Sequence, residues 1–400
     1  MKNLYTVNPD YRSLVSRYGS PLLVLDQATI RHQYRALSRA LPSVTLHYAL
    51  KPLPHPAVVA ALKEEGCSFD LATKGEVDLA RNAGVDPDTC IHTHPIKKDE
   101  EISYALDYGC RIFVIDNVEE AKKFIPYRHM ARLLVRVSFP NPETPVDLSK
   151  KFGVLPEECL DLLRYARRLG LDVAGLSFHV GSQVPNARRH CEAIEQCAAL
   201  LKQAEAEGMR LEILDIGGGF PVDYENAREQ DIYAFCEPIR EALGQVPEGT
   251  RLLAEPGRFI SAPAMINICT VVGKATRFGK PWYYLDDGIY CSYSGQLFDH
   301  VTYPKYAPYV DGPVRESVLA GPTCDSIDII AENIMLPDLQ VDDIIVGKMM
   351  GAYTISTATE FNFISKTEIL IVDTDRDEEL KSLYQVEPAR KKVDALKLVS

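Results

Sequence analysis

The feature that most constrains this fold is an alternation of short apolar runs with amphipathic helical patterns over the first two-thirds of the chain. The segments between the runs have helical periodicity, and several end in glycine, as helices commonly do. Eight β-α repeats with short loops predict a closed parallel (β/α)8 barrel, an α/β fold. An open doubly wound sheet would need a glycine-rich phosphate turn after an early strand, and none is present. The predicted strands are Leu46–Leu50, Ser68–Ala72, Cys90–His94, Arg111–Asp116, Leu133–Val137, Gly175–Val180, Leu211–Ile216 and Leu252–Glu255.

The pattern changes after residue 262, where the chain becomes β-rich and is interrupted by turn residues. Segments such as MINICTVVGKATRF, PWYYLDDG, DDIIVGKMMGAYT and TEILIV predict an antiparallel β domain at the C-terminal side of the barrel. A length of 400 residues fits two domains. We therefore expect a barrel domain over residues 26–262, and a β-rich domain made of residues 1–25 and 263–400.

Composition excludes several classes of function. The net charge is −12 and no Lys/Arg-rich patch appears, which argues against a nucleic-acid partner. No apolar run is long enough to span a membrane, and the N-terminus lacks the apolar stretch of a secretory signal. Ten cysteines without a CxxC pair argue against a zinc site or a disulfide framework. We expect reduced thiols, no bound metal and a cytoplasmic protein.

Polar residues recur at the ends of the predicted strands, where barrel enzymes carry their chemistry. They converge on one mouth of the barrel, and a purely structural core would not require them there. These residues are Lys51, Asp70, Arg136, His179, Gly217–Gly219 and Glu255.

Each of these residues has a chemical interpretation beside a structural one. Lys51 can form an imine with an aldehyde cofactor, and burial would depress its pKa for that role. The glycines of LDIGGGFP allow backbone N–H groups to approach a phosphate, although a tight turn also needs glycine. Glu255 could keep a pyridine nitrogen protonated, or form a structural ion pair with Arg258. His179 could stack on a flat ring, or pack in the core.

Seven motifs together carry a resemblance that none of them carries alone. YALK, FDLATKGE, SFHVGS, LDIGGGFP, AEPGRF, GPTCDSID and GAYT occur in this order and at fitting distances. From about residue 20 to residue 366 the chain resembles the fold-type III pyridoxal-phosphate decarboxylases, the ornithine/diaminopimelate/arginine decarboxylase group. The resemblance implies pyridoxal 5'-phosphate as cofactor and decarboxylation of an amino acid as the reaction.

The resemblance also implies roles for single residues. Lys51 would bind the cofactor covalently, His179 would stack on its ring, and Glu255 would hold the pyridine nitrogen. Asp70 would lie near the cofactor, and Arg136 would support Glu255. The phosphate would be held by Ser182, Gly217, Gly218, Gly219, Gly257, Arg258 and Tyr353.

The family's active sites are shared between two subunits, so the resemblance implies a homodimer. Cys324 would be the acid that protonates the carbanion after CO2 leaves, and Asp325 would bind the substrate. Both would come from the partner subunit. Lys151 and Asp328 match positions that pair across the family's dimer interface.

The substrate implied is a basic amino acid, ornithine or lysine, leading to a diamine for polyamine biosynthesis. QLFDHVTYP resembles the ornithine-type loop, in which Asp299 joins Asp325 as a second acid for the distal ammonium. HYALKPLPHP, HTHPIKK and FNFI depart from the usual ornithine-enzyme motifs, so the choice between ornithine and lysine stays open. The alternatives are diaminopimelate and a modified diamino acid. A racemase would be expected to lack GPTCD, and an inactive antizyme-inhibitor homologue would lose cofactor ligands that this chain retains.

Overall fold

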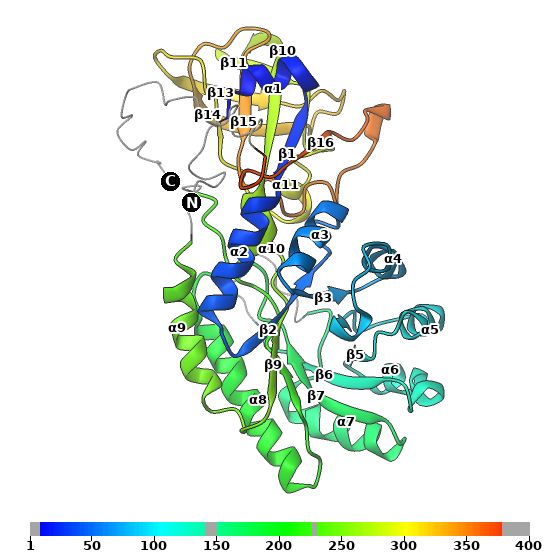
Figure 1. Cartoon of the computed structure of the whole chain (residues 1–400). Coiled ribbons are helices and arrows are strands. Elements are labelled where there is room, and N and C mark those ends of the chain that lie inside the picture. Colours follow the sequence, from blue (N-terminus) through cyan, green and yellow to red (C-terminus); the bar gives the residue numbers. More distant parts are fainter. Residues whose placement is uncertain (1–8, 141–149, 226–229, 378–400) are drawn as a thin grey trace.

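A closed barrel of eight parallel strands forms the larger part of the molecule (Figure 1). The computed structural model describes residues 9–140, 150–225 and 230–377. All eight predicted barrel strands are confirmed, with boundaries that move by a few residues. The barrel strands are β2 (Val44–Ala49), β3 (Ser68–Leu71), β4 (Cys90–His92), β5 (Ile112–Ile115), β6 (Arg132–Val137), β7 (Asp172–Phe178), β8 (Ile213–Asp215) and β9 (Arg251–Ala254).

Helices surround the barrel, and side-chain caps define where several of them begin. Thr73 caps one helix by accepting a hydrogen bond from the backbone N–H of Glu76, and the Glu76 carboxylate accepts one from the backbone N–H of Ala72, just before the cap. Asn117 caps another helix by accepting from the backbone N–H of Glu120. The helices around the barrel are α2 (Gln27–Ala40), α3 (Pro56–Glu64), α4 (Lys74–Asn82), α5 (Asp99–Tyr108), α6 (Val118–Lys123), α7 (Pro156–Arg168), α8 (Arg188–Ala206), α9 (Ile232–Leu243) and the short α10 (Arg258–Ser261).

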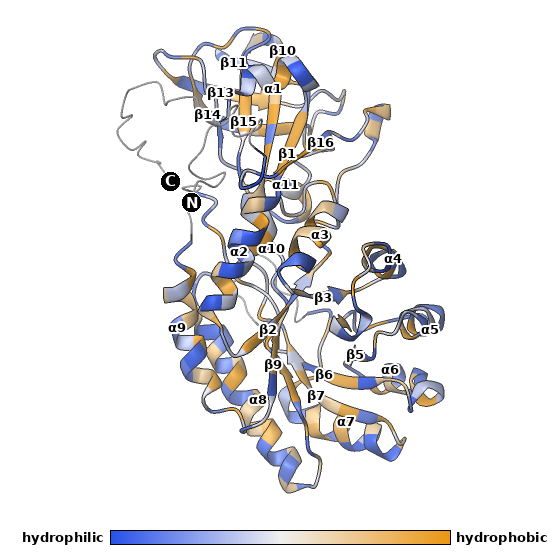
Figure 2. Cartoon of the chain, in the orientation of Figure 1, coloured by the Kyte–Doolittle hydropathy of each residue, from blue (hydrophilic) through white to orange (hydrophobic). Residues whose placement is uncertain are grey.

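The barrel interior is apolar in its lower part and polar at its mouth. Alternate residues along each strand point inward, and the inner cluster consists of Ile91, Ile112, Val114, Leu134, Ala174, Ile213 and Leu253. Figure 2 shows that the barrel strands are mostly hydrophobic, whereas the surrounding helices carry both hydrophobic and hydrophilic residues. Continuing the alternation by two residues brings polar side chains, such as Asp215 and Glu255, to the mouth of the barrel.

The second domain is an eight-stranded sheet, as expected for the C-terminal part of the chain. It is mixed rather than purely antiparallel, because β11 pairs in parallel with β13 and β1 pairs in parallel with β16. Its strands are β1 (Leu22–Asp26), β10 (Met265–Arg277), β11 (Lys280–Leu285), β12 (Lys305–Tyr306), β13 (Arg315–Ala320), β14 (Ile329–Leu336), β15 (Ile344–Gly347) and β16 (Glu368–Val372). Two helices accompany them, α1 (Tyr11–Tyr18) and α11 (Gly295–Phe298).

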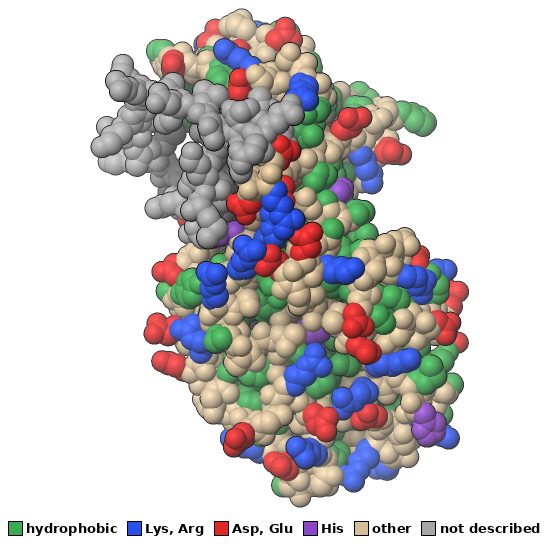
Figure 3. Space-filling view, viewed as in Figure 1, with side chains coloured by type: hydrophobic (Ala, Val, Ile, Leu, Met, Phe, Trp, Pro, Cys, Tyr) green, Lys and Arg blue, Asp and Glu red, His purple; other side chains and the backbone are tan. Residues whose placement is uncertain are grey.

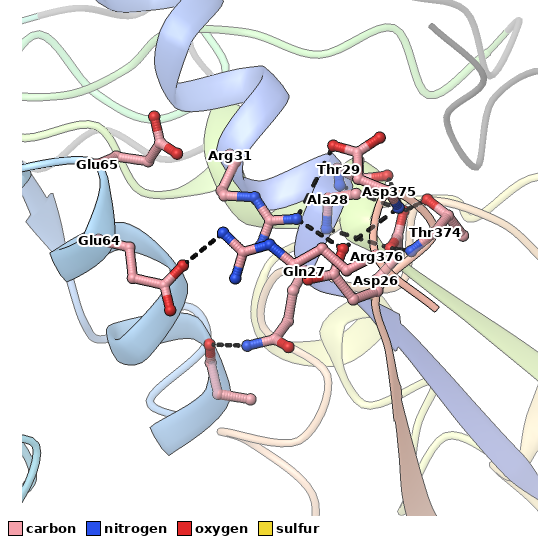
Figure 4. Close-up of polar contacts among 12 residues, drawn as sticks. Asp26, Gln27, Ala28, Thr29, Arg31, Glu64, Glu65, Thr374, Asp375 and Arg376 are labelled. Atoms are coloured by element: carbon pink, nitrogen blue, oxygen red, sulfur yellow. Dashed lines mark hydrogen bonds and ion pairs between the residues drawn. The ribbon is translucent and has the colours of Figure 1, made fainter. Parts of the chain in front are cut away.

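The two domains meet where β1 ends and α2 begins (Figure 4). The buried carboxylate of Asp26 accepts hydrogen bonds from the backbone N–H groups of Ala28 and Thr29, which cap α2. It also accepts bonds from the backbone N–H and hydroxyl of Thr374, just after β16. Arg31 of α2 pairs with Asp373 at 2.6 Å. The start of the barrel and the end of the sheet are therefore fastened together by one polar cluster.

The visible surface carries acidic and basic side chains side by side, without a large patch of one sign (Figure 3). Among the described residues, no helix is both long and apolar enough to cross a membrane. The same residues contain no group of three or more His, Cys, Asp or Glu side chains that could bind a metal ion.

Candidate active site

A cavity of about 250 Å³ opens at the carboxyl ends of the barrel strands. The barrel supplies residues from the loops after β2, β7, β8 and β9, and the sheet domain supplies residues around α11 and after β15. The cavity therefore lies between the two domains. Its lining is Ala49, Lys51, His179, Ser182, Gly219, Phe220, Glu255, Gly257, Arg258, Phe298, Asp299, Tyr353 and Thr357.

Lys51 follows β2 and presents its side chain to this cavity. The amine is exposed to the cavity itself, although protein atoms surround the whole side chain. Burial alone lowers the pKa of Lys51, but Tyr353, Asp70 and Glu255 outweigh it and raise that pKa above its ordinary value. The expectation of a depressed pKa was wrong, because it counted burial and left out the acidic neighbours.

The glycine turn after β8 forms one wall of the cavity and has no room for side chains. A Cβ atom on Gly217, which has φ of 65°, would lie 2.2 Å from the carbonyl oxygen of Phe178. A Cβ atom on Gly218 would lie 2.7 Å from the carbonyl oxygen of Glu255 and 3.1 Å from Nε2 of His179. Packing against neighbouring backbone therefore requires glycine at these two positions, while Gly219, the third glycine, lines the cavity and presents backbone without a side chain to it, as a phosphate site requires.

Arg258 lies beside this turn at the start of α10. Its guanidinium donates to the Ser182 hydroxyl at 2.8 Å and to the Tyr224 hydroxyl at 3.0 Å. Asp299 pairs with it through two contacts, Nη2 to Oδ1 at 2.7 Å and Nη1 to Oδ2 at 2.6 Å. Arg258 also lies 4.9 Å from the ring centre of Tyr353. A fixed guanidinium beside a glycine turn is suited to an anionic group such as a phosphate.

Groups of opposite charge surround Glu255, which lines the cavity. The carboxyl group of Asp70 accepts a hydrogen bond from the Thr93 hydroxyl at 2.6 Å. Burial and the charge of Glu255 raise the pKa of Asp70 well above its ordinary value. Arg136 is the cation of this layer, and its strongest attraction is to Glu255. The arrangement can hold a proton on a group that Glu255 faces.

His179, just after β7, has a neutral imidazole at neutral pH. Burial, reinforced by the positive charges of Lys51 and Arg136, holds the pKa of His179 well below its ordinary value. Its Nδ1 accepts a hydrogen bond from the backbone of Gly181 at 3.1 Å, which fixes the ring. A fixed, uncharged ring that lines a cavity can stack on a planar ligand.

Comparison with known proteins decides the family. The sequence profile described as "Pyridoxal-dependent decarboxylase, pyridoxal binding domain" matches residues 27–262. The chain belongs to the pyridoxal-dependent decarboxylases. Its cofactor is pyridoxal 5'-phosphate, and it is an enzyme of the carboxy-lyase class.

Individual relatives of this decarboxylase cover nearly the whole chain. A lysine/ornithine decarboxylase of Selenomonas ruminantium is 35% identical over 98% of this chain and 99% of its own length. Antizyme inhibitor 2 of Xenopus laevis is 33% identical over 86% of this chain and 79% of its own length. The crystal structure of a Vibrio vulnificus lysine/ornithine decarboxylase with cadaverine is 52% identical, with a TM-score of 0.86, and covers 90% of this chain and 97% of that one.

The cavity of this decarboxylase fits pyridoxal 5'-phosphate. An amine for the aldehyde is supplied by Lys51, and an anion site is supplied by the glycine turn with Arg258 and Ser182. A carboxylate, Glu255, lines the same cavity. The residues expected to bind the two ends of the cofactor therefore occur in one cavity.

Cys324 and Asp325 do not line this cavity of their own chain. Cys324 is exposed, and the described residues contain no other exposed cysteine. Its sulfur lies 3.5 Å from Oδ1 of Asn362. Asp325 accepts a hydrogen bond from the Tyr290 hydroxyl at 2.6 Å, which lowers the pKa of Asp325. The ring of Tyr290 stacks on Phe361 at 4.3 Å, so the whole group has a defined geometry.

The pairing of Asp328 with Lys151 of a second subunit stays a prediction, and the single chain shows how the Asp328 carboxylate is held. Asp328 is only 2% exposed. Its carboxylate accepts bonds from the backbone N–H groups of Ile289 and Thr323, and from the Thr323 hydroxyl. These bonds fix the orientation of the Asp328 carboxylate within its own chain.

The sequence interpretation missed several residues of the site. Phe298 and Thr357 line the cavity, and Tyr224 binds Arg258. Asp215 is buried at the end of β8, next to the glycine turn. The alternation along the strand could have revealed Asp215, because it lies two residues after the inward-facing Ile213.

Proposed function

We propose that this enzyme releases CO2 from L-lysine and L-ornithine, giving the corresponding diamines for polyamine biosynthesis. The observation that carries the proposal is the position of the Lys51 amine in one cavity with the glycine turn and Arg258. Two relatives named lysine/ornithine decarboxylase, one of them solved with cadaverine, support this choice of substrates.

In this proposal each cavity residue has one task. Lys51 would hold the cofactor covalently through its amine. Bound pyridoxal phosphate supplies the electron sink into which the bond to the carboxylate breaks. Glu255, supported by Arg136, keeps the pyridine nitrogen protonated, with Asp70 nearby. His179 stacks on the ring. The phosphate is held by Ser182, Gly217, Gly218, Gly219, Gly257, Arg258 and Tyr353.

We propose that the enzyme is a homodimer with shared active sites. Cys324 and Asp325 are chemically active groups of the sheet domain that do not line their own chain's cavity. In a dimer, Cys324 of one chain returns a proton to the substrate carbon in the other chain's site. Asp325 binds the distal ammonium there. Asp299, from the chain that supplies the cavity, helps to bind the same ammonium, and its carboxylate also contacts Arg258.

The test is a comparison of substrates. Purified enzyme with added pyridoxal phosphate is given L-lysine, L-ornithine, L-arginine or meso-diaminopimelate at equal concentration, and CO2 release is measured. We expect release from lysine and ornithine, and little from the other two, because an acidic pair favours a distal ammonium over a distal carboxylate. Lys51→Ala is the matched control and should release no CO2.

A clear preference for diaminopimelate would contradict the acidic pair. Release from none of the four amino acids by cofactor-loaded protein would also contradict the proposal, and would point to a modified diamino acid. Full activity of Lys51→Ala would show that the cofactor lysine is another residue.

Two further proposals concern organisation. We propose that residues 26–262 form the cofactor domain and that residues 1–25 with 263–400 form the second domain. The family match over residues 27–262 and the pairing of β1 with β10 support this division. Residues 1–8 and 378–400 of the second domain lie outside the described part of the chain. We also propose a cytoplasmic location, supported by ten free cysteines.

A further inference from the structure

Asp215 is a buried carboxyl group beneath the cavity to which the proposed chemistry gives no task. It ends β8, between Ser177 of β7 and Leu253 of β9 in the barrel register. It is 0% exposed. Its Oδ1 accepts a hydrogen bond from the backbone N–H of Gly217 at 2.9 Å, which fixes the plane of the carboxyl group.

The second oxygen of Asp215 has an unusual neighbour. Among the described residues, no hydrogen-bond donor reaches Oδ2 of Asp215. Glu255 follows the neighbouring strand β9 and lines the cavity, and its backbone N–H donates to the carbonyl oxygen of Gly217 at 2.8 Å. Two neighbouring carboxyl groups in an enclosed site cannot both be anions at moderate cost. Burial and the nearby charge of Glu255 raise the pKa of Asp215 well above its ordinary value.

The surrounding cations indicate which of the two groups is the anion. The charged and titratable groups facing this pair are Asp70 of β3, Arg136 of β6, and Lys51 after β2. Arg136 interacts more strongly with Glu255 than with Asp215. Lys51 interacts with Asp70 and Glu255. Both cations therefore favour a negative charge on Glu255, and the proton belongs on Asp215.

We propose that Asp215 is a positioning residue that keeps its proton and donates it in a hydrogen bond to Glu255. Glu255 is thereby held as an anion, oriented toward the pyridine nitrogen of the cofactor. The task of Glu255 rests on the proposed function, whereas the proton on Asp215 is a property of the chain itself. Asp215 acts through Glu255 and touches neither cofactor nor substrate.

Two substitutions of Asp215 test whether the enzyme needs a hydrogen-bond donor at this position or a negative charge. In Asp215→Asn the amide oxygen can still accept from Gly217, and the NH2 group can donate to Glu255. Asp215→Leu keeps the branched shape and the number of side-chain heavy atoms but has no donor. We expect kcat of Asp215→Asn to stay within about threefold of the parent, and kcat of Asp215→Leu to fall by at least about tenfold with cofactor content unchanged.

Either of two kinetic results would overturn the proposal. If Asp215→Asn loses as much activity as Asp215→Leu, the carboxylate charge is what matters. If Asp215→Leu keeps its activity, Glu255 needs no donor. Should the leucine variant fail to fold, Asp215→Asn still decides, because a large loss of kcat in this folded variant contradicts a proton-donating role.

A second measurement needs neither cofactor nor substrate. A protonated carboxylic acid has a carbonyl stretching band that a carboxylate lacks. We expect the infrared difference spectrum between cofactor-free parent and cofactor-free Asp215→Asn, at neutral pH, to contain this band. Its absence would overturn the proposal. Its presence in a protein that decarboxylates none of the tested amino acids would contradict the proposed function and leave the proton on Asp215 established.

Discussion

At the scale of single residues, the charge of each side chain in the site depends more on the charged side chains around it than on how deeply it is buried. Lys51 is surrounded by protein, yet its acidic neighbours keep the amine a cation when no cofactor is bound. His179 is held neutral in the same cavity, because its charged neighbours are the cations Lys51 and Arg136. A cationic amine must lose a proton before it can attack an aldehyde. The carboxyl groups around Lys51 are the available acceptors.

Glu255 provides the sharpest residue-scale prediction. Glu255→Gln keeps the shape of the side chain and removes its negative charge. We expect cofactor content to stay near that of the parent, since Lys51 and the phosphate site are intact, while kcat falls by at least about tenfold, roughly 1.4 kcal/mol of barrier. Cofactor content from absorbance and kcat from CO2 release check this outcome. A smaller loss with full cofactor content would show that a charged contact to the pyridine nitrogen is not needed.

The site residues differ in how far sequence could predict them. Lys51, His179 and Glu255 each follow a barrel strand, so their convergence follows from finding the strands. Asp299 occurs in a recognisable loop, but its pairing with Arg258 brings together residues 41 positions apart. The resemblance alone assigns Asp328 to a dimer interface, and only the folded chain shows that its carboxylate accepts bonds from the backbone of Ile289 and Thr323. Contacts across elements depend on packing that local patterns do not contain.

At the scale of elements, one carboxylate connects three of them. Asp26 ends β1, caps α2 and binds Thr374 beyond β16 (Figure 4). Close by, Arg376 pairs with Glu64 of α3 at 2.8 Å. The barrel and the sheet therefore share this boundary, and loss of the cap should weaken both.

We expect Asp26→Ala to lower the free energy of unfolding by about 2–4 kcal/mol, from the lost cap and the unpaired buried N–H groups. Asp10→Ala is the matched control, since Asp10 caps the short α1 with a partly exposed carboxylate. It should cost only about 1 kcal/mol. Urea unfolding of both variants measures the difference. Equal losses would show that Asp26 does no more than cap its helix.

Strand pairing explains which elements sequence could predict. The barrel strands follow one another along the chain, each paired with its sequence neighbours, and only β2 and β9 close the ring. In the second domain β1 pairs with β16, so residue 22 lies opposite residue 368. Apolar periodicity identifies such strands but contains no information about partners so distant, which is why the parallel pairs of the sheet were not anticipated.

At the scale of the whole molecule, the single chain separates groups that the proposed reaction needs together. The cavity contains Lys51, His179 and Glu255, but not the thiol of Cys324. Cys324 is exposed on the sheet domain, beside Asp325 and the stacked rings of Tyr290 and Phe361. A rigid, exposed cluster around a thiol is suited to entering the site of another copy. A symmetric dimer would place two such clusters on two cavities.

Mixing two inactive variants tests this arrangement. The Lys51→Ala chain lacks the cofactor lysine but keeps its Cys324. The Cys324→Ala chain lacks the thiol but keeps its Lys51. In a mixed dimer one site has both defects and the other has neither. With random exchange of equal amounts, about a quarter of all sites should be intact, because half of the dimers are mixed and each rebuilds one site of two. Activity measured by CO2 release should recover to about that fraction of the parent.

The control is Lys51→Ala mixed with the double variant Lys51→Ala/Cys324→Ala. No site in that mixture contains the cofactor lysine, so activity should stay at the background of Lys51→Ala alone. Exchange of subunits is verified by giving one variant an affinity tag and recovering mixed dimers by mass. Recovered mixed dimers of Lys51→Ala with Cys324→Ala that show no activity would contradict shared sites, since each of them must contain one site with an intact Lys51 and an intact Cys324 from the opposite chain. Activity in those dimers, absent from the control, would place Cys324 in its partner's reaction.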